Sequence, residues 1–169
     1  MNSCPACGAP LALRPDTAGF QCGYCHKVFF PGAEEDGVEI SGETSDPNLN
    51  CPVCFQPLVK GSLANTSILY CQQCHGLLMR MEIVADLVDE LRGKLDGAAV
   101  QTPADRDDLK RVIQCPKCNR RMDAHFYAGP GNVVVDTCDN CSLIWLDRGE
   151  ITRIARAPDE GDLERTYGF

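Results

Sequence analysis

Long apolar runs are missing from this chain. No stretch approaches the ~20 apolar residues that a membrane-spanning helix requires, so we expect no membrane anchor. Residues 1–20 also lack the basic start and apolar core of a secretory signal, and Cys4 stands almost at the beginning. Disulfide-rich chains normally carry such a signal, because disulfides persist in oxidising compartments. We therefore expect a cytoplasmic protein with reduced thiols, which use a metal rather than disulfides.

Basic residues and histidines are also scarce. The chain has 16 Lys and Arg against 24 Asp and Glu, a formal net charge of −8. A chain this acidic repels phosphate backbones, which disfavours nucleic acid as a partner. The three histidines, His26, His75 and His125, stand at no spacing that suggests a nucleophile partner, and no Gly-rich phosphate loop occurs. The sequence therefore predicts a protein that is not an enzyme.

Cysteine, by contrast, is abundant. The 12 cysteines form six C-x-x-C pairs: Cys4/Cys7, Cys22/Cys25, Cys51/Cys54, Cys71/Cys74, Cys115/Cys118 and Cys138/Cys141. Taken two pairs at a time, they define three units with 14, 16 and 19 residues between the pairs. Two thiolate pairs brought together by a β-hairpin complete the tetrahedral sulfur site that Zn²⁺ prefers. Since no cysteine is left over, the sequence predicts three zinc ions, one per unit.

The similarity of the three units extends beyond their cysteines. An apolar residue stands seven positions after each first cysteine, at Leu11, Leu58 and Met122, and an apolar triplet begins three positions after each last cysteine. Units this short cannot bury enough apolar surface to fold alone, whereas a structural zinc ion contributes about 10–16 kcal/mol. We therefore predict a small metal-stabilised α+β fold. It consists of three tandem zinc ribbons, each a β-hairpin or three-stranded sheet, with short connecting helices.

Composition divides the chain into five segments. They are zinc ribbon 1 (1–30), an acidic flexible linker (31–50), zinc ribbon 2 with an amphipathic helix (51–100), a helix with zinc ribbon 3 and a capped helix (101–157), and an acidic tail (158–169). The linker contains six acidic residues and no basic one, a composition that buries little surface and favours an extended, mobile chain.

Hydrophobic patterning predicts the elements of the middle of the chain. In ribbon 2 we expect strands at 56–59 and 67–70, joined by a turn around 61–65. Helical spacing predicts a helix over 81–95. Its apolar stripe either packs on a ribbon or a neighbouring helix, or forms a seam with a second copy or a partner. A second helix is predicted over 103–113, and a hairpin of the two helices is one possible arrangement.

A third helix is predicted to begin near Arg148 and to end before Pro158. Asp147 and Glu150 stand three residues apart at its start, which is the spacing of a capping box. We interpret these two acids as helix-capping residues rather than as a catalytic acid–base pair.

The third unit carries the most specific motifs. C-P-x-C precedes Met122, and V-V-x-D-x-C-x-x-C is followed by I-W-L-D-R-G-E. With these motifs the unit resembles the transcription factor IIB-type zinc-ribbon, or zinc-finger, family. The resemblance is close over 115–156, weaker over 51–90, and reduced to the general ribbon pattern over 1–30. It implies zinc ligation by the four cysteines of this unit. It also makes a link to transcription an expectation, because the family is named after a ribbon that docks on RNA polymerase.

Two other metal centres remain open alternatives. The motif C-x-x-C-H, at Cys22–His26 and Cys71–His75, is also the attachment motif of c-type haem. Haem would require export and would leave the neighbouring cysteine pairs unused. Iron bound by four thiolates, as in rubredoxin, is the closer alternative, since sequence alone does not distinguish it from zinc.

The function that we expect is that of a non-enzymatic, zinc-binding adaptor whose ribbon surfaces contact a protein partner. Trp145 is a candidate anchor for the partner if it is exposed; otherwise it covers the metal knuckle or packs under the last helix. The alternative is a nucleic-acid-binding ribbon that uses the basic cluster Lys117, Arg120 and Arg121. A thiol-based redox or zinc sensor is a further alternative.

Overall fold

The computed structural model describes residues 4, 7–13, 20–25, 28–29, 37–44, 49–95, 108–127 and 132–158 of the 169-residue chain. In these residues ten strands form one antiparallel sheet, in the order β1-β2-β3-β4-β5-β6-β7-β10-β9-β8. The strands are β1 Leu11–Leu13, β2 Phe20–Cys22, β3 Val28–Phe29, β4 Val38–Thr44, β5 Val59–Leu63, β6 Thr66–Tyr70, β7 Leu77–Arg80, β8 Asp123–Phe126, β9 Val134–Cys138 and β10 Leu143–Leu146. The helices are α1 Val84–Arg92 and α2 Glu150–Arg156, with short 3-10 turns η2 Met81–Ile83 and η3 Asp108–Lys110.

Each cysteine unit forms a three-stranded ribbon. The strands β1–β3, β5–β7 and β8–β10 belong to units 1, 2 and 3, and in each unit the first two strands form a hairpin. The third strand follows the last cysteine and contains the apolar triplet or its beginning. The predicted fold class of three ribbons in a small α+β protein is therefore confirmed.

The hairpin of unit 2 turns later than the sequence predicted. Ala64 and Asn65 both have positive φ angles, 47° and 65°, which is the conformation of a type I′ turn. Gly61 lies inside β5, opposite Ile68, rather than in the turn. A Cβ on Gly61 would lie 3.0 Å from the carbonyl oxygen of Glu39, so glycine here permits the close approach of β4. The first strand starts at Val59, three residues later than expected.

Units 2 and 3 are joined edge to edge through their third strands. Across this seam the paired residues are Leu77–Leu146, Leu78–Trp145, Met79–Ile144 and Arg80–Leu143. In each unit the apolar triplet begins three residues after the last cysteine. Since β7 and β10 are antiparallel, the first residue of one triplet is paired with the last residue of the other. The pairing is therefore symmetric, like the isologous contact of a dimer, with a local two-fold axis near the Leu78–Trp145 pair.

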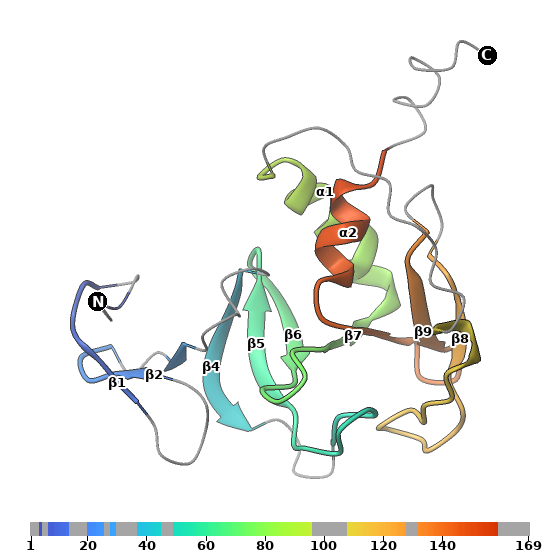
Figure 1. The fold of residues 1–169 in the computed structure, drawn as a ribbon, viewed down its shortest axis with the longest axis horizontal. Helices are drawn as coiled ribbons and strands as arrows, with labels where there is room; N and C mark the ends of the chain where they lie inside the picture. Colours follow the sequence, from blue (N-terminus) through green and yellow to red (C-terminus); the bar gives the residue numbers. More distant parts are fainter. Residues whose placement is uncertain are drawn as a thin grey trace.

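The two helices cover one side of this seam and lie side by side (Figure 1). Val84, Leu87 and Val88 of α1 are buried in a core that also contains Ile151 and Ile154 of α2. The buried part of the apolar stripe of the helix predicted over 81–95 therefore packs inside the chain, against its neighbouring helix, as the first of the two alternatives has it. No helix in the described part of the chain is long and apolar enough to cross a membrane.

The helix predicted over 103–113 is wrong for the residues that can be compared. Residues 103–107 lie outside the described ranges, Asp108–Lys110 form a single 3-10 turn, and residues 111–113 have no regular secondary structure. Tertiary contacts explain the difference: Arg111 reaches two carboxylates of unit 3, and the carbonyl of Ile113 accepts a hydrogen bond from the N–H of Met122 (2.9 Å). Accordingly α1 has α2, not this segment, as its neighbouring helix.

Part of the segment expected to be a flexible linker is a strand. Val38–Thr44 form β4, which pairs with β5 and, through Ile40 opposite Val28, with β3 of unit 1. Ile40 is buried in the core, so the burial of its side chain and the pairing of β4 outweigh the acidic composition of the segment. Residues 31–36 and 45–48 lie outside the described ranges. The boundaries of the five predicted segments stay a prediction.

Candidate metal centres

The twelve cysteines converge into three groups of four, one group in each ribbon. Within each group the Sγ atoms all lie within 4.8 Å of one another. Contacts between the two pairs of a group include Cys54–Cys71 at 3.3 Å and Cys118–Cys138 at 3.6 Å between sulfur atoms. Four thiolates at one centre are the donor set of structural zinc. The structure thus brings together every predicted quartet and positions it for one zinc ion.

Among the described residues, four C-x-x-C knuckles share one backbone pattern. The N–H of the first cysteine donates to the carbonyl five residues later, at 2.7–2.9 Å for Cys4, Cys51, Cys71 and Cys115. The carbonyl of the same cysteine accepts a hydrogen bond from the N–H four residues later, at 2.8–3.0 Å. Further N–H groups point at sulfur, as those of Val53 and Cys54 do at Cys51 Sγ, both at 3.4 Å. Such donors stabilise a thiolate.

In the five knuckles where the structure describes it, the residue that follows the second cysteine has a left-handed conformation; His26, after Cys25, lies outside the described residues. The five residues are Gly8, Phe55, His75, Asn119 and Ser142, with φ between 52° and 76°. In the C-x-x-C-H motif at Cys71–His75, the histidine thus stands at a position that requires a positive φ angle, and other knuckles have Gly, Phe, Asn or Ser there. The Nδ1 of His75 forms a hydrogen bond with the hydroxyl of Tyr70. Geometry of the knuckle, rather than haem attachment, accounts for this motif.

The ionisation of the thiols within a group is strongly uneven. Hydrogen bonds from backbone N–H groups lower the pKa of Cys22 to about 6 and the pKa of Cys118 to about 7. Burial raises the pKa of Cys115 to about 12. Four adjacent thiols therefore do not lose their protons together unless a cation balances the charge. A divalent ion that binds all four thiolates supplies this balance.

The three centres differ in exposure. Units 2 and 3 each have two buried and two half-buried cysteines, whereas in unit 1 Cys7 is exposed. The centres of units 2 and 3 also share one apolar cluster, which contains Cys51, Cys71, Cys115 and Cys138 together with Leu58, Leu78, Ile113, Met122 and Trp145. Two metal centres thus lie over a common core on the side of the sheet away from the helices.

Trp145 joins the two halves of this core and is fully buried. Its Nε1–H donates to Oδ1 of Asp147 at 3.0 Å. A Cβ on Gly76 would lie 2.1 Å from Cζ2 of the indole, so the ring occupies the space that a side chain in the second knuckle of unit 2 would fill. The interpretation of Trp145 as an exposed partner anchor is wrong, because its side chain is buried in the core shared by units 2 and 3.

An ion-pair network next to the third centre was not predicted from the sequence. Arg111 forms ion pairs with Asp136, which is fully buried, and with Asp147. Burial raises the pKa of Asp136, and the guanidinium of Arg111 opposes this shift. A basic residue shortly before the first cysteine, together with acids in the V-V-x-D and W-L-D motifs, is the signal that could have identified the network. Arg111 thereby ties the entry of unit 3 to β9 and to the end of β10.

The capping box at the start of α2 is half formed. The N–H of Asp147 donates to Oε2 of Glu150 at 2.7 Å, as the motif requires. The Asp147 carboxylate, however, accepts from Trp145 and Arg111 instead of from the helix, which begins at Glu150 after Gly149 in a left-handed conformation (φ 77°). Burial raises the pKa of Glu150 to about 7.

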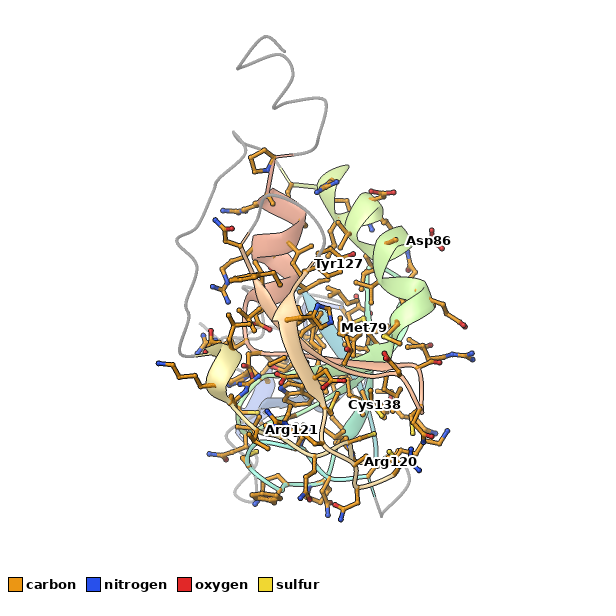
Figure 2. The ribbon with its side chains drawn as sticks, turned by 90° about the vertical axis from the view of Figure 1, so that its right-hand side faces the viewer. Met79, Asp86, Arg120, Arg121, Tyr127 and Cys138 are labelled. Atoms are coloured by element: carbon orange, nitrogen blue, oxygen red, sulfur yellow. The ribbon has the colours of Figure 1, made fainter. Side chains whose placement is uncertain are left out.

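The predicted basic cluster lies on the surface of the third unit. Lys117, Arg120 and Arg121 are all exposed, and Arg120 donates to the side-chain oxygen of Asn140 at 3.3 Å. Figure 2 shows Arg120 and Arg121 in the lower half of the view, below α1 with its Asp86. No carboxylate of a described residue forms an ion pair with Lys117 or Arg121. Whether these side chains contact a partner stays a prediction.

The fold and the sulfur centres together define a zinc-binding protein built from three zinc ribbons. Residues 114–157 match the model of a family described as transcription factor zinc-finger, of the transcription factor IIB zinc-ribbon type. The match covers about a quarter of the chain and confirms the resemblance over 115–156. No curated protein and no solved structure matches the chain.

Proposed function

We propose that this protein is a non-enzymatic adaptor, in which three zinc centres stabilise ribbon surfaces that bind a protein partner. Each group of four thiolates fills the coordination shell of zinc, whereas a catalytic zinc keeps an open position. Reduced thiols of this number suit the cytoplasm, where we place the protein. The link to transcription rests on the family match of the third unit.

One observation carries the proposal: large apolar side chains are exposed at or beside the metal knuckles. Tyr24, between the cysteines of a knuckle in unit 1, is 79% exposed, and Phe55, which closes the first knuckle of unit 2, is 75% exposed. Val112, three residues before the first cysteine of unit 3, is 58% exposed. Apolar side chains held in water by a rigid, metal-fixed backbone are typical anchors of protein interfaces.

Affinity capture with the zinc-loaded full chain tests the proposal. We expect a set of retained proteins that is lost from Tyr24→Ala and Phe55→Ala variants and after zinc removal. The matched control is Phe126→Ala, which removes an exposed aromatic from β8 rather than from a knuckle. If the retained proteins are the same for all variants, or if only nucleic acid is retained, the adaptor proposal is wrong.

Nucleic-acid binding is the second candidate function. It is supported by the exposed Lys117 and Arg121, which have no acidic partner among the described residues. A salt titration with a single-stranded oligonucleotide tests it, because phosphate contacts weaken steeply as salt increases. If the full chain binds no oligonucleotide at low salt, this candidate is excluded.

A further inference from the structure

The first knuckles of units 2 and 3 lie next to each other and enclose a groove. This knuckle groove, defined by residues 50–55 and 112–119, has a volume of about 460 Å³. Pro52 and Pro116, at equivalent positions of the two knuckles, both line it. The volume is within the range of about 300–1,000 Å³ that is usual for binding pockets. The groove therefore has room for a few side chains of a bound peptide.

The two walls of the groove differ in their side chains although the two knuckles have the same backbone hydrogen bonds. Counted from the first cysteine of each unit, the positions of Lys117, Arg120 and Arg121 in unit 3 correspond to Val53, Gln56 and Pro57 in unit 2. The exposed Phe55 and Val112 line the groove itself. Lys117 directly follows the lining residue Pro116, and Arg121 is paired with the lining residue Gln114 in an isolated antiparallel β-bridge. The groove thus combines exposed apolar side chains with two exposed basic residues beside its unit 3 wall, called the basic rim below.

We propose that the knuckle groove binds an acidic segment of a protein partner that also carries a large apolar side chain. This inference rests on the proposed adaptor function and names its docking site. The apolar side chain would contact Phe55 and Val112, and the carboxylates would pair with Lys117 and Arg121, which lack an ion pair within the described residues. The attraction for an acidic segment comes from the basic residues beside the groove and not from the whole chain, which has a net charge of −8.

A peptide fits these walls better than a nucleic acid does. Single-stranded nucleic acids stack their bases on several aromatic faces along a basic channel. The groove offers one aromatic ring, that of Phe55, and its other exposed apolar side chain, Val112, is aliphatic. A polyanion would also extend beyond the few basic residues of the rim into the field of an acidic protein.

The groove is expected to exist only when both neighbouring zinc ions are bound. Cys51 and Cys115 line it, and each is the first cysteine of its metal centre. Loss of either ion would release the knuckle that forms one wall. Binding at this groove should therefore depend on zinc in units 2 and 3.

Selection from a display library of random peptides tests the proposal, with the zinc-loaded full chain as bait. We expect the wild-type chain to enrich peptides that combine Asp or Glu with a large apolar residue. The variant Lys117→Glu/Arg121→Glu should lose these peptides and enrich Lys- and Arg-containing ones instead. For a selected peptide, synthesised with a fluorescent label, we expect Phe55→Ala to weaken binding about tenfold or more, and Phe126→Ala to leave binding unchanged. Zinc content and circular dichroism establish that each variant is folded.

Other outcomes overturn the proposal in distinguishable ways. Enrichment of the same peptides by the wild type and the charge-reversed variant, or no enrichment, means that the groove does not recognise acidic segments. Salt-sensitive binding of a single-stranded oligonucleotide without peptide enrichment assigns the basic rim to nucleic acid instead. If proteins captured from extract persist with Lys117→Glu/Arg121→Glu but are lost with Tyr24→Ala, the adaptor function holds and the docking site lies elsewhere.

Discussion

The first ribbon and the joined pair of ribbons 2 and 3 have the same metal-binding chemistry but differ in how they are held in the sheet. The cysteines of unit 1 lie as close together as those of the other units, and its first knuckle has the same backbone hydrogen bonds. Unit 1 joins the rest of the sheet through β3 and β4, with Val28 opposite Ile40. Units 2 and 3, by contrast, share a seam, two adjacent helices and an apolar cluster that contains cysteines of both centres.

This difference separates two contributions to the stability of a small metal protein. Metal ligation alone fixes a knuckle and a hairpin. Packing between units adds a core that no single ribbon of this length could form. In the pair, metal binding and packing are coupled, because Leu78 and Trp145 belong to one apolar cluster with cysteines of both centres. We therefore expect the zinc ions of units 2 and 3 to stabilise one cooperative domain, and the zinc ion of unit 1 to stabilise its own ribbon.

The largest expected effect is that of a ligand substitution in the pair. Cys138→Ser removes a buried ligand of unit 3, and with it a metal whose binding contributes about 10–16 kcal/mol. Since whole domains are stable by only about 5–15 kcal/mol, we expect units 2 and 3 to unfold together. Hydrogen exchange should show loss of protection in β5–β10, α1 and α2, and zinc content should fall by two ions.

The matched variant is Cys22→Ser, at the corresponding position of unit 1 and equally buried. It should cost one zinc ion and leave the protection of the pair unchanged. If Cys138→Ser leaves unit 2 protected and metal-loaded, ribbons 2 and 3 fold independently of each other and do not form one cooperative domain.

Removal of the guanidinium that holds unit 3 to its preceding segment should have the next largest effect. Arg111→Ala would leave the fully buried Asp136 and the half-buried Asp147 without their counter-charge. Loss of one partner of a buried ion pair costs about 3–5 kcal/mol. We expect this loss in the free energy of unfolding of the pair, measured by urea denaturation, with zinc binding in unit 1 unaffected.

Two further variants examine whether charge explains the effect of Arg111. Lys117→Ala removes an exposed, unpaired cation and should change the free energy of unfolding by less than about 0.5 kcal/mol. Asp136→Asn, combined with Arg111→Ala, should restore part of the stability, because no buried carboxylate is then left unpaired at this position. An Arg111→Ala protein as stable as the wild type would show that the network does not contribute to the stability of the pair.

These parts of the molecule differ in how well the sequence predicted them. The cysteine quartets and the third strands depend on spacing within each unit. In unit 3, for example, the C-x-x-C spacing of Cys115 and Cys118 and the apolar triplet that begins at Ile144 were sufficient to predict them. The seam between β7 and β10 depends on contacts between residues far apart in the sequence, and no local pattern specifies it. Ile40 forms part of a strand within an acidic segment because β5 pairs with that segment. Arg111 lies outside any α-helix because its carboxylate partners lie in β9 and just after β10. Tertiary contacts thus decided each element that the sequence did not predict.

A single added methyl group at the seam tests the packing of the pair directly. In Gly76→Ala the new Cβ would overlap the indole of Trp145, which is fully buried. Overpacking of this kind costs about 1–3 kcal/mol, so we expect a comparable decrease in the free energy of unfolding. The control is Gly93→Ala at the end of α1, where a Cβ would meet only ordinary contacts, 3.6 Å from the carbonyl oxygen of Glu90. It should be neutral or stabilising by up to about 1 kcal/mol. Equal effects of the two substitutions would mean that the indole moves aside without cost.

The smallest expected effect depends on pH and concerns Glu150, which lies at the start of α2 and is 1% exposed. Burial raises its pKa from 4.5 to about 7, and the nearby Asp147 carboxylate contributes to the shift. Between pH 4.5 and about 7 the folded chain therefore retains a proton that the unfolded chain has lost. Because the folded state binds more protons in this window, the contribution of Glu150 to the free energy of unfolding decreases as pH rises, and it levels off above about 7. Protonation of the cysteine ligands at low pH acts in the opposite direction, so the pH profile of the wild type alone does not isolate this group.

Glu150→Gln isolates it, because glutamine still accepts the hydrogen bond from the N–H of Asp147 but does not titrate. We expect the variant to be more stable than the wild type at pH 8 by on the order of 1–2 kcal/mol. The difference should shrink as the pH falls through 7 and reach its lower limit near 4.5, the pKa of the unfolded side chain. Urea denaturation of both zinc-loaded proteins at matched pH values measures this difference, and the effect of the ligand thiols cancels between them. A constant difference across this range would mean that Glu150 is ionised in the folded pair, and that its carboxylate is stabilised by Arg153, 3.3 Å away, more strongly than burial disfavours it.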